Sequence, residues 1–109
     1  MGIKWLKECL DEEYPRVISC SFPGNRCMDL AYRGKSGEKL SYRIYTPEGT
    51  EYLIGQDVVD KVRGLGVTLL VAGHFCQVGM AAKAYAKSKG IPIVNNKQFF
   101  AKVGNGEEF

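Results

Sequence analysis

Two residues with reactive side chains lie close together in the segment VAGHFCQVG, Val71 to Gly79. His74 is the only histidine of the chain, and Cys76 follows it by two positions. An imidazole beside a thiol can form a nucleophilic dyad, and a helix N-terminus lowers the pKa of a nearby thiol. An ordinary strand-to-helix turn with a buried cysteine could have the same sequence, so both interpretations stay open.

The same histidine and cysteine also belong to a candidate zinc site. Together with Cys20 and Cys27, they would complete four ligands. Structural zinc sites place roughly two to four residues between paired cysteines. Six residues separate Cys20 from Cys27, so the spacing argues against zinc.

Basic and aromatic side chains are interleaved between residues 32 and 45. The basic residues are Arg33, Lys35, Lys39 and Arg43, and the tyrosines are Tyr32, Tyr42 and Tyr45. Cations contact phosphates and aromatic rings stack on bases, so the pattern is typical of a nucleic-acid interface. The same pattern is expected of a strand pair that buries its tyrosines and exposes its lysines and arginines to water.

Length and composition limit what can position these groups. The chain has 109 residues, 45% hydrophobic and 25% charged, which predicts a single domain over 1–109. A net charge of +3 is compatible with a polyanionic partner but does not establish one. The first residues form neither a signal peptide nor a membrane span, so we expect a cytoplasmic protein with four reduced cysteines.

Hydrophobic periodicity and turn residues divide the chain into elements. The predicted helices cover 3–14, 51–63 with Thr50 as N-cap, 80–89, and 97–103 with Asn95 or Asn96 as N-cap. The predicted strands cover 16–22, 27–33, 39–46, 67–73 and 91–94. Met80, Ala81, Ala84 and Tyr85 form the predicted apolar stripe of the third helix, and residues 104–109 are expected to be frayed.

This order predicts an α/β fold in which a mixed sheet is sandwiched by helices. A helix comes first, and the next three strands form an antiparallel meander. The order then continues helix, strand, helix, strand, helix, with right-handed crossovers. The uninterrupted apolar run VTLLVAG predicts a central strand covered on both faces.

The order of elements and the segment VTLLVAGHFCQVGMAAKAYAKSKGIPIVNNKQFF resemble the restriction-endonuclease-like fold. The similarity is greatest to its Mrr-type and Holliday-junction-resolvase branches, within the PD-(D/E)xK superfamily. It covers Gly66 to Val103 in detail, whereas the first half matches in element order and in one acidic residue. BRCT domains share a similar ending, but they open with a strand followed by a helix, which disfavours them.

The resemblance implies a metal-dependent nuclease site. Such enzymes hold Mg²⁺ between an aspartate on the second strand and the acidic residue of an E-x-K motif on the third. Asp29 stands at the first position, but Ser41 and Arg43 occupy the likely E-x-K positions. Glu13 on the first helix could supply the second carboxylate, as a glutamate does in the resolvase branch, unless it is simply a solvated residue.

Three functions follow as expectations. The favoured one is a DNA-binding protein with a degenerate nuclease site, which could also bind a protein partner or form a homodimer. The second is an active Mg²⁺-dependent endonuclease that uses Asp29 and Glu13 as metal ligands and Arg43 to stabilise phosphate charge. The third is a small α/β module that binds a ligand where AGHFCQ ends a parallel strand.

Overall fold

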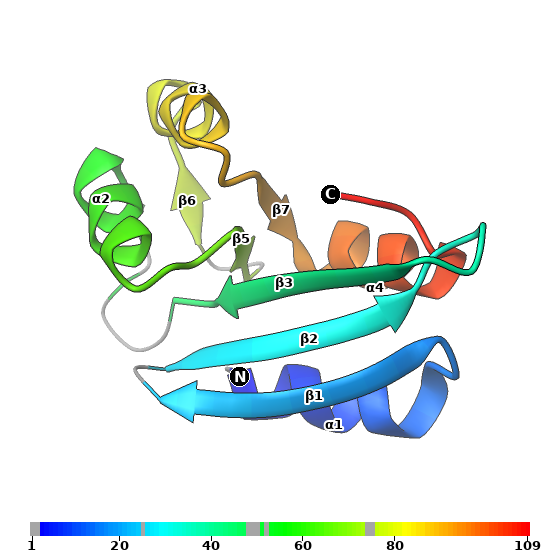
Figure 1. Cartoon of the computed structure of the whole chain (residues 1–109). Coiled ribbons are helices and arrows are strands. Elements are labelled where there is room, and N and C mark those ends of the chain that lie inside the picture. The colour runs from blue at the N-terminus through cyan, green and yellow to red at the C-terminus, as the bar shows by residue number, and fades with distance from the viewer. Residues whose placement is uncertain (1–2, 25, 48–50, 52, 74–75) are drawn as a thin grey trace.

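The computed structural model describes residues 3–24, 26–47, 51, 53–73 and 76–109. Figure 1 shows a mixed sheet with helices packed around it. The helices are α1 (Ile3–Glu13), α2 (Gln56–Gly64), α3 (Met80–Ser88) and α4 (Asn96–Asn105). The strands are β1 (Val17–Gly24), β2 (Cys27–Arg33), β3 (Lys39–Tyr45), β4 (Leu53–Ile54), β5 (Leu69–Ala72), β6 (Gln77–Val78) and β7 (Ile93–Asn95).

The main sheet has five strands in the order β1-β2-β3-β5-β7. β1, β2 and β3 pair antiparallel, whereas β5 lies parallel to both β3 and β7. All four residues of β5 are buried, as an uninterrupted apolar strand requires. The predicted α/β class, the meander and the central parallel strand are therefore confirmed.

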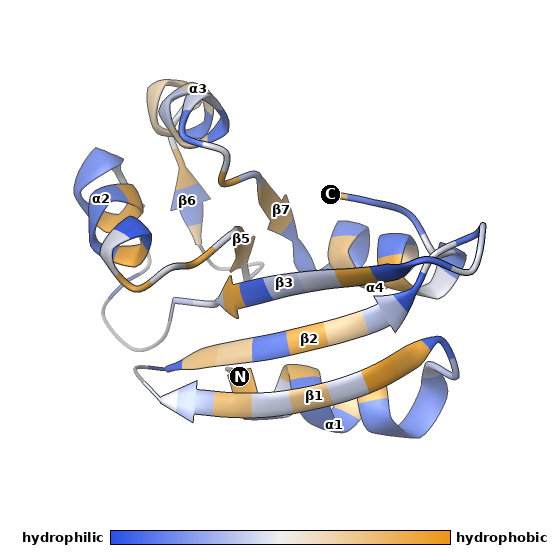
Figure 2. Ribbon diagram, viewed as in Figure 1, coloured by the Kyte–Doolittle hydropathy of each residue, from blue (hydrophilic) through white to orange (hydrophobic). Residues whose placement is uncertain are grey.

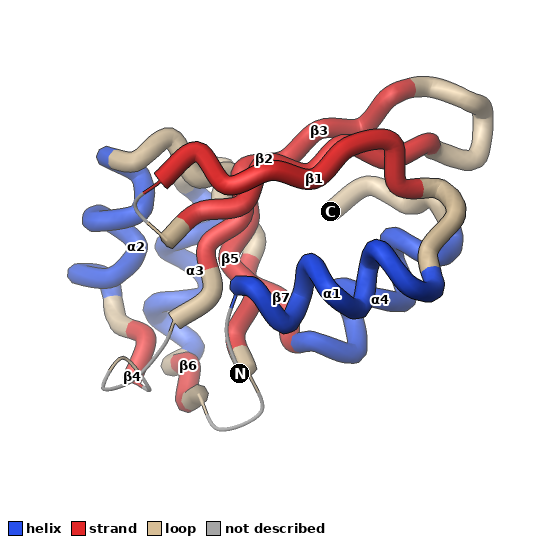
Figure 3. Tube along the Cα trace, turned by 90° about the horizontal axis from the view of Figure 1, so that it is seen from below, coloured by secondary structure: helices blue, strands red, loops and turns tan. Residues whose placement is uncertain are grey.

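Two hydrophobic clusters lie on opposite faces of the sheet. On one face, α1 and α4 lie side by side, and the edge of the Trp5 ring meets Phe100 with centroids 5.7 Å apart (Figure 3). On the other face, α2 and α3 pack over β5, β7 and the ends of β2 and β3. Figure 2 shows β5 and β7 as hydrophobic, whereas polar bands cross β2 and β3. The second pair of helices thus leaves much of the meander uncovered.

The second helix is shorter than predicted. Leu53 and Ile54 form β4, which pairs parallel with β6, and α2 begins only at Gln56. Gly55, the N-cap, is extended at φ −113° and ψ −172°, so the helix does not continue into the strand. Thr50, the predicted N-cap, lies outside the described residues. The prediction of a helix from residue 51 is therefore wrong.

The predicted stripe of α3 is also wrong. Ala82 and Ala86 are the buried residues of this helix, whereas Met80 is 90% exposed. Of the predicted stripe, Tyr85 is partly buried against the same cluster, whereas Ala81 and Ala84 are exposed. Two buried alanines one turn apart allow the helix to approach the core closely. The N-cap of α4 is confirmed, because Asn95 and Gln98 form a reciprocal capping box.

The C-terminal residues differ from the expected frayed tail. α4 extends to Asn105, and Gly106 ends it at φ 68°, a left-handed conformation that favours glycine. The backbone N–H of Phe109 donates to the Tyr42 hydroxyl at 3.0 Å. The Phe109 ring also stacks on Phe99, so the last residue closes one end of the core.

Candidate functional site

The side chains of β2 and β3 form a ladder of three facing pairs. In the antiparallel register Asp29 lies opposite Arg43, Ala31 opposite Ser41, and Arg33 opposite Lys39. The alternate residues of β2, Met28, Leu30 and Tyr32, belong to the cluster under α1 and α4. Because side chains alternate along a strand, the three facing pairs lie on the other side of the sheet.

This surface is the open face, which consists of the three pairs together with Ser19 and Ser21 of β1. Ser19 lies opposite Ala31 and Ser21 opposite Asp29, so both serines share the face. A shallow pocket of about 450 Å³ lies in it, and Gly66 and Thr68 add to the lining at the start of β5. The structure therefore brings together Asp29, Ser41, Arg43 and Lys39.

Asp29 and Arg43 form a bidentate ion pair at one end of this face. Arg43 Nε donates to Asp29 Oδ1 at 2.8 Å, and Nη2 donates to Oδ2 at 3.1 Å. Arg43 Nη1 also donates to the Leu65 carbonyl at 3.2 Å. The hydrogen bonds and charge of Asp29 raise the pKa of Arg43. The aspartate thus holds the guanidinium in one orientation and neutralises its charge.

This arrangement does not fit a Mg²⁺ site. Both oxygens of Asp29 already accept from Arg43, and the neighbouring Ser41 is a weak ligand for the ion. Glu13 ends α1, which packs on the opposite face of the sheet, so the structure does not bring it to Asp29. Among residues 3–24, 26–47, 51, 53–73 and 76–109, no group of three His, Cys, Asp or Glu residues could hold a metal.

Two like charges face each other at the other end of the ladder. Arg33 and Lys39 are exposed cross-strand partners. Within the described part of the chain, neither has a carboxylate within ion-pairing distance. Directly opposed like charges destabilise a sheet. Lys35 differs from them, because it lies in the β2–β3 turn and its Nζ is 3.5 Å from Glu107 Oε1.

The structure does not bring the proposed zinc ligands together. Cys27 and Cys76 belong to the cluster under α2 and α3, whereas Cys20 packs against the opposite cluster. Burial raises the pKa of all three thiols, which disfavours the thiolate that a metal or a nucleophile requires. His74 lies outside the described residues.

Cys76 also does not lie at a helix N-terminus, the position that would have lowered its pKa in the predicted dyad. It precedes β6, and α3 begins only at Met80, so the thiol is not at a helix N-terminus. Its backbone N–H donates to the Gly73 carbonyl at 2.9 Å. The expected activation by a helix N-terminus is therefore wrong.

The sequence pattern missed a polar cluster around the end of β3. The Tyr45 hydroxyl donates to Glu51 and accepts from Lys61 Nζ at 3.0 Å, and Lys61 also pairs with Glu51. The Arg26 and Lys61 cations lie over the Tyr45 ring, 5.7 and 5.1 Å from its centroid. These residues come from separate elements with no motif spacing, so no sequence signal would have found them.

A second pocket is larger than the one in the open face, and the residue types did not indicate it. Its volume is about 590 Å³, and it lies at the carboxyl ends of β5 and β7, beside the start of α4. The third function expected from the sequence, a small ligand-binding module, would place its ligand at this edge of the sheet. The sequence did not indicate which side chains would line it, because they come from four separate segments.

Comparison with protein-family models, with curated proteins and with solved structures gave no match. None of the helices in the described ranges is both long and apolar enough to cross a membrane.

Proposed function

We propose that the chain binds nucleic acid through the open face. The observation that carries this proposal is the facing pair of Arg33 and Lys39, two exposed cations in register, neither of which forms an ion pair with a described residue. Such a pair costs stability in the free protein and is relieved when a phosphate lies between the cations. A phosphodiester backbone supplies that charge in a repeating form.

The rest of the face suits a polyanion of this kind. Three cations, Arg33, Lys39 and Arg43, and the single carboxylate of Asp29 give it a net charge of 3 − 1 = +2. The like-charged pair and the Asp29–Arg43 pair are four residues apart along β2, or about 13 Å at the usual strand rise. Hydroxyl groups of Ser19, Ser21 and Ser41 lie on the same face and can donate to phosphate oxygens.

In this proposal Asp29 positions Arg43 and does not ligate a metal. Three of the five guanidinium N–H groups of Arg43 are used by Asp29 and Leu65. The remaining two can donate to a phosphate from a fixed orientation. The interaction is with the backbone and not with base edges, so we expect weak sequence preference.

The test measures binding of a fluorescein-labelled 20-nucleotide single strand and of the matching duplex, at 50 and 200 mM KCl. Binding should weaken at the higher salt concentration, because counterions compete with the cations. Arg33→Gln combined with Lys39→Gln should weaken binding at least about fivefold. Lys4→Gln combined with Lys87→Gln removes the same charge from two exposed lysines on α1 and α3, outside the open face, and is the matched control.

Asp29→Asn separates binding from catalysis. It removes a negative charge from the face, so binding should strengthen or stay unchanged. The same variant is incubated with duplex, single-stranded and branched DNA in Mg²⁺ or Mn²⁺. Cleavage by the wild type that Asp29→Asn abolishes would overturn the positioning role, and an absence of salt-sensitive binding would overturn the proposal itself.

A further inference from the structure

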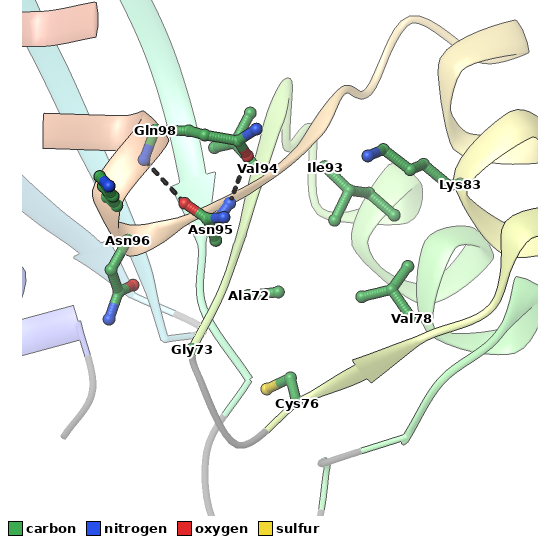
Figure 4. Close-up of a pocket in the computed structure, with 11 residues that line it drawn as sticks. Ala72, Gly73, Cys76, Val78, Lys83, Ile93, Val94, Asn95, Asn96 and Gln98 are labelled. Carbon is green, nitrogen blue, oxygen red and sulfur yellow. Dashed lines mark hydrogen bonds between the residues drawn. The ribbon is translucent and has the colours of Figure 1, made fainter. Parts of the chain in front are cut away.

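The pocket at the carboxyl ends of β5 and β7 is lined by two kinds of side chain. The apolar lining residues are Ala72, Val78, Ile93 and Val94. The polar lining residues are Lys83, Asn95, Asn96, Lys97 and Gln98, and Gly73 and Cys76 complete the lining. Figure 4 shows Lys83 reaching from α3 toward Ile93, on the side of Val78, whereas Asn95 and Gln98 lie on the opposite side. This mixed lining suits a ligand that has an apolar body and a polar group.

The polar lining residues are rich in hydrogen-bond donors. Lys83 and Lys97 are exposed, neither forms an ion pair within the described ranges, and no carboxylate is among the lining residues. Glu51 acts electrostatically on Cys76, but it is itself paired with Lys61. A cavity with unpaired cations and no lining acid attracts anions.

The capping box of α4 adds to this donor set. Asn95 Oδ1 accepts from the Gln98 backbone N–H at 2.7 Å, and Gln98 Oε1 accepts from the Asn95 backbone N–H at 3.0 Å. Figure 4 shows both hydrogen bonds beside the pocket. Because each side-chain amide uses its oxygen in the box, its NH₂ group stays available as a donor. An anion accepts from such groups, whereas a cation cannot.

We propose that this pocket binds a small organic anion, with a phosphate or carboxylate group held between Lys83 on one side and the side-chain amides of Asn95 and Gln98 on the other. The apolar body of the ligand packs against Ile93 and Val78, which line the pocket beside Lys83. The volume of about 590 Å³ is in the usual range for small-molecule sites. This site is separate from the open face, because Thr68 lines the shallow pocket before β5 begins and Ala72 lines this one at its end.

The test is a titration of the full-length ¹⁵N-labelled protein, followed by the amide resonances of Gly73, Val94 and Lys97. The first probe is phenyl phosphate, which combines a ring with the anion. Phenol supplies the ring alone, inorganic phosphate supplies the charge alone, and benzoate replaces phosphate by carboxylate. We expect phenyl phosphate or benzoate to shift these resonances saturably, with a Kd at least about tenfold lower than that of phenol or inorganic phosphate.

Variants link the shifts to this pocket. Lys83→Gln should weaken binding of the tighter probe at least about fivefold. Lys87→Gln makes the same charge change one turn further along α3, outside the lining, and should have no effect. Because both lysines are exposed, the fold should survive either change. Arg33→Gln combined with Lys39→Gln should leave this binding intact.

Each remaining outcome overturns the inference. If neither phenyl phosphate nor benzoate gives saturable shifts, the pocket does not bind organic anions. Equal weakening by Lys83→Gln and Lys87→Gln would show a response to net charge alone. Shifts confined to the open face, and lost with Arg33→Gln and Lys39→Gln, would assign the anion to that face.

Discussion

Replacing Lys39 by glutamine should make the protein more stable and a weaker binder of nucleic acid. Lys39 lies directly opposite Arg33 on an exposed sheet face. For two unit charges about 7 Å apart in water, Coulomb repulsion is about 0.6 kcal/mol, in the range measured for cross-strand pairs. Lys39→Gln removes this repulsion, so the free energy of unfolding should rise by about that amount at low salt.

Two assays on Lys39→Gln check the predicted gain in stability and the predicted loss of nucleic-acid binding. Urea unfolding in 20 mM salt, followed by the fluorescence of the single tryptophan, Trp5, should show the midpoint rising by about 0.5 M. Anisotropy titrations with the single strand should show the slope of log K against log salt becoming shallower by about 0.7. Arg33→Gln should behave alike, and the double variant should gain no more stability than either single variant, because one change already removes the repulsion.

Either of two results would exclude this role for Arg33 and Lys39. If both single substitutions lower stability, Arg33 and Lys39 do not repel each other as their register indicates. If the salt slope changes no more than in Lys4→Gln, the pair does not contact phosphate. Together the two measurements separate a functional cation pair from exposed residues that merely keep the surface polar.

Two further predictions concern contacts that the sequence pattern did not reveal. Burial alone would raise the pKa of Glu51, but hydrogen bonds from Lys61 and Tyr45 bring it below its ordinary value. Its ionised form therefore stabilises the fold above the unfolded-state pKa, and this contribution is lost as the pH falls through the lowered folded-state pKa. Urea titrations from pH 7 to 3 should show the stability difference between the wild type and Glu51→Gln shrinking with falling pH; parallel curves would contradict this. Phe109→Ala should lower the free energy of unfolding by about 2 kcal/mol, since the ring is partly buried against Phe99 and Tyr42. An unchanged urea midpoint would show that the C-terminal residue does not stabilise the core.

The uncovered meander gives these predictions a common physical basis. A meander covered by helices on one face only must present polar side chains on the other, and β2 and β3 do so with charged pairs in register. Asp29 and Arg43 compensate each other there, whereas Arg33 and Lys39 do not. The difference between these two pairs distinguishes a structural ion pair from a candidate binding site.

Local patterns were sufficient for the meander. The segment KLSYRIY alternates with period two, and both it and CMDLAYR are bounded by turn residues, so the structure has β2 and β3 where the sequence predicts them. The shared face of Asp29 with Arg33, and of Ser41 with Arg43, follows from the same alternation. The helices were harder to predict. The alanines of α3 give little periodic signal, so its buried face was not recognised. The start of α2 was misplaced because β4, which precedes it, pairs with the distant β6.

By itself, then, the sequence determined the order of the helices and of the main-sheet strands, the buried central strand and the strand faces, because these depend on neighbours along the chain. Only the tertiary structure decided which of those faces helices would cover. It placed Glu13 and Cys20 away from their expected partners, since packing on opposite sides of a sheet leaves no mark in sequence spacing. It also assembled the ligand pocket, because β5, β7 and the start of α4 come together only when the chain folds.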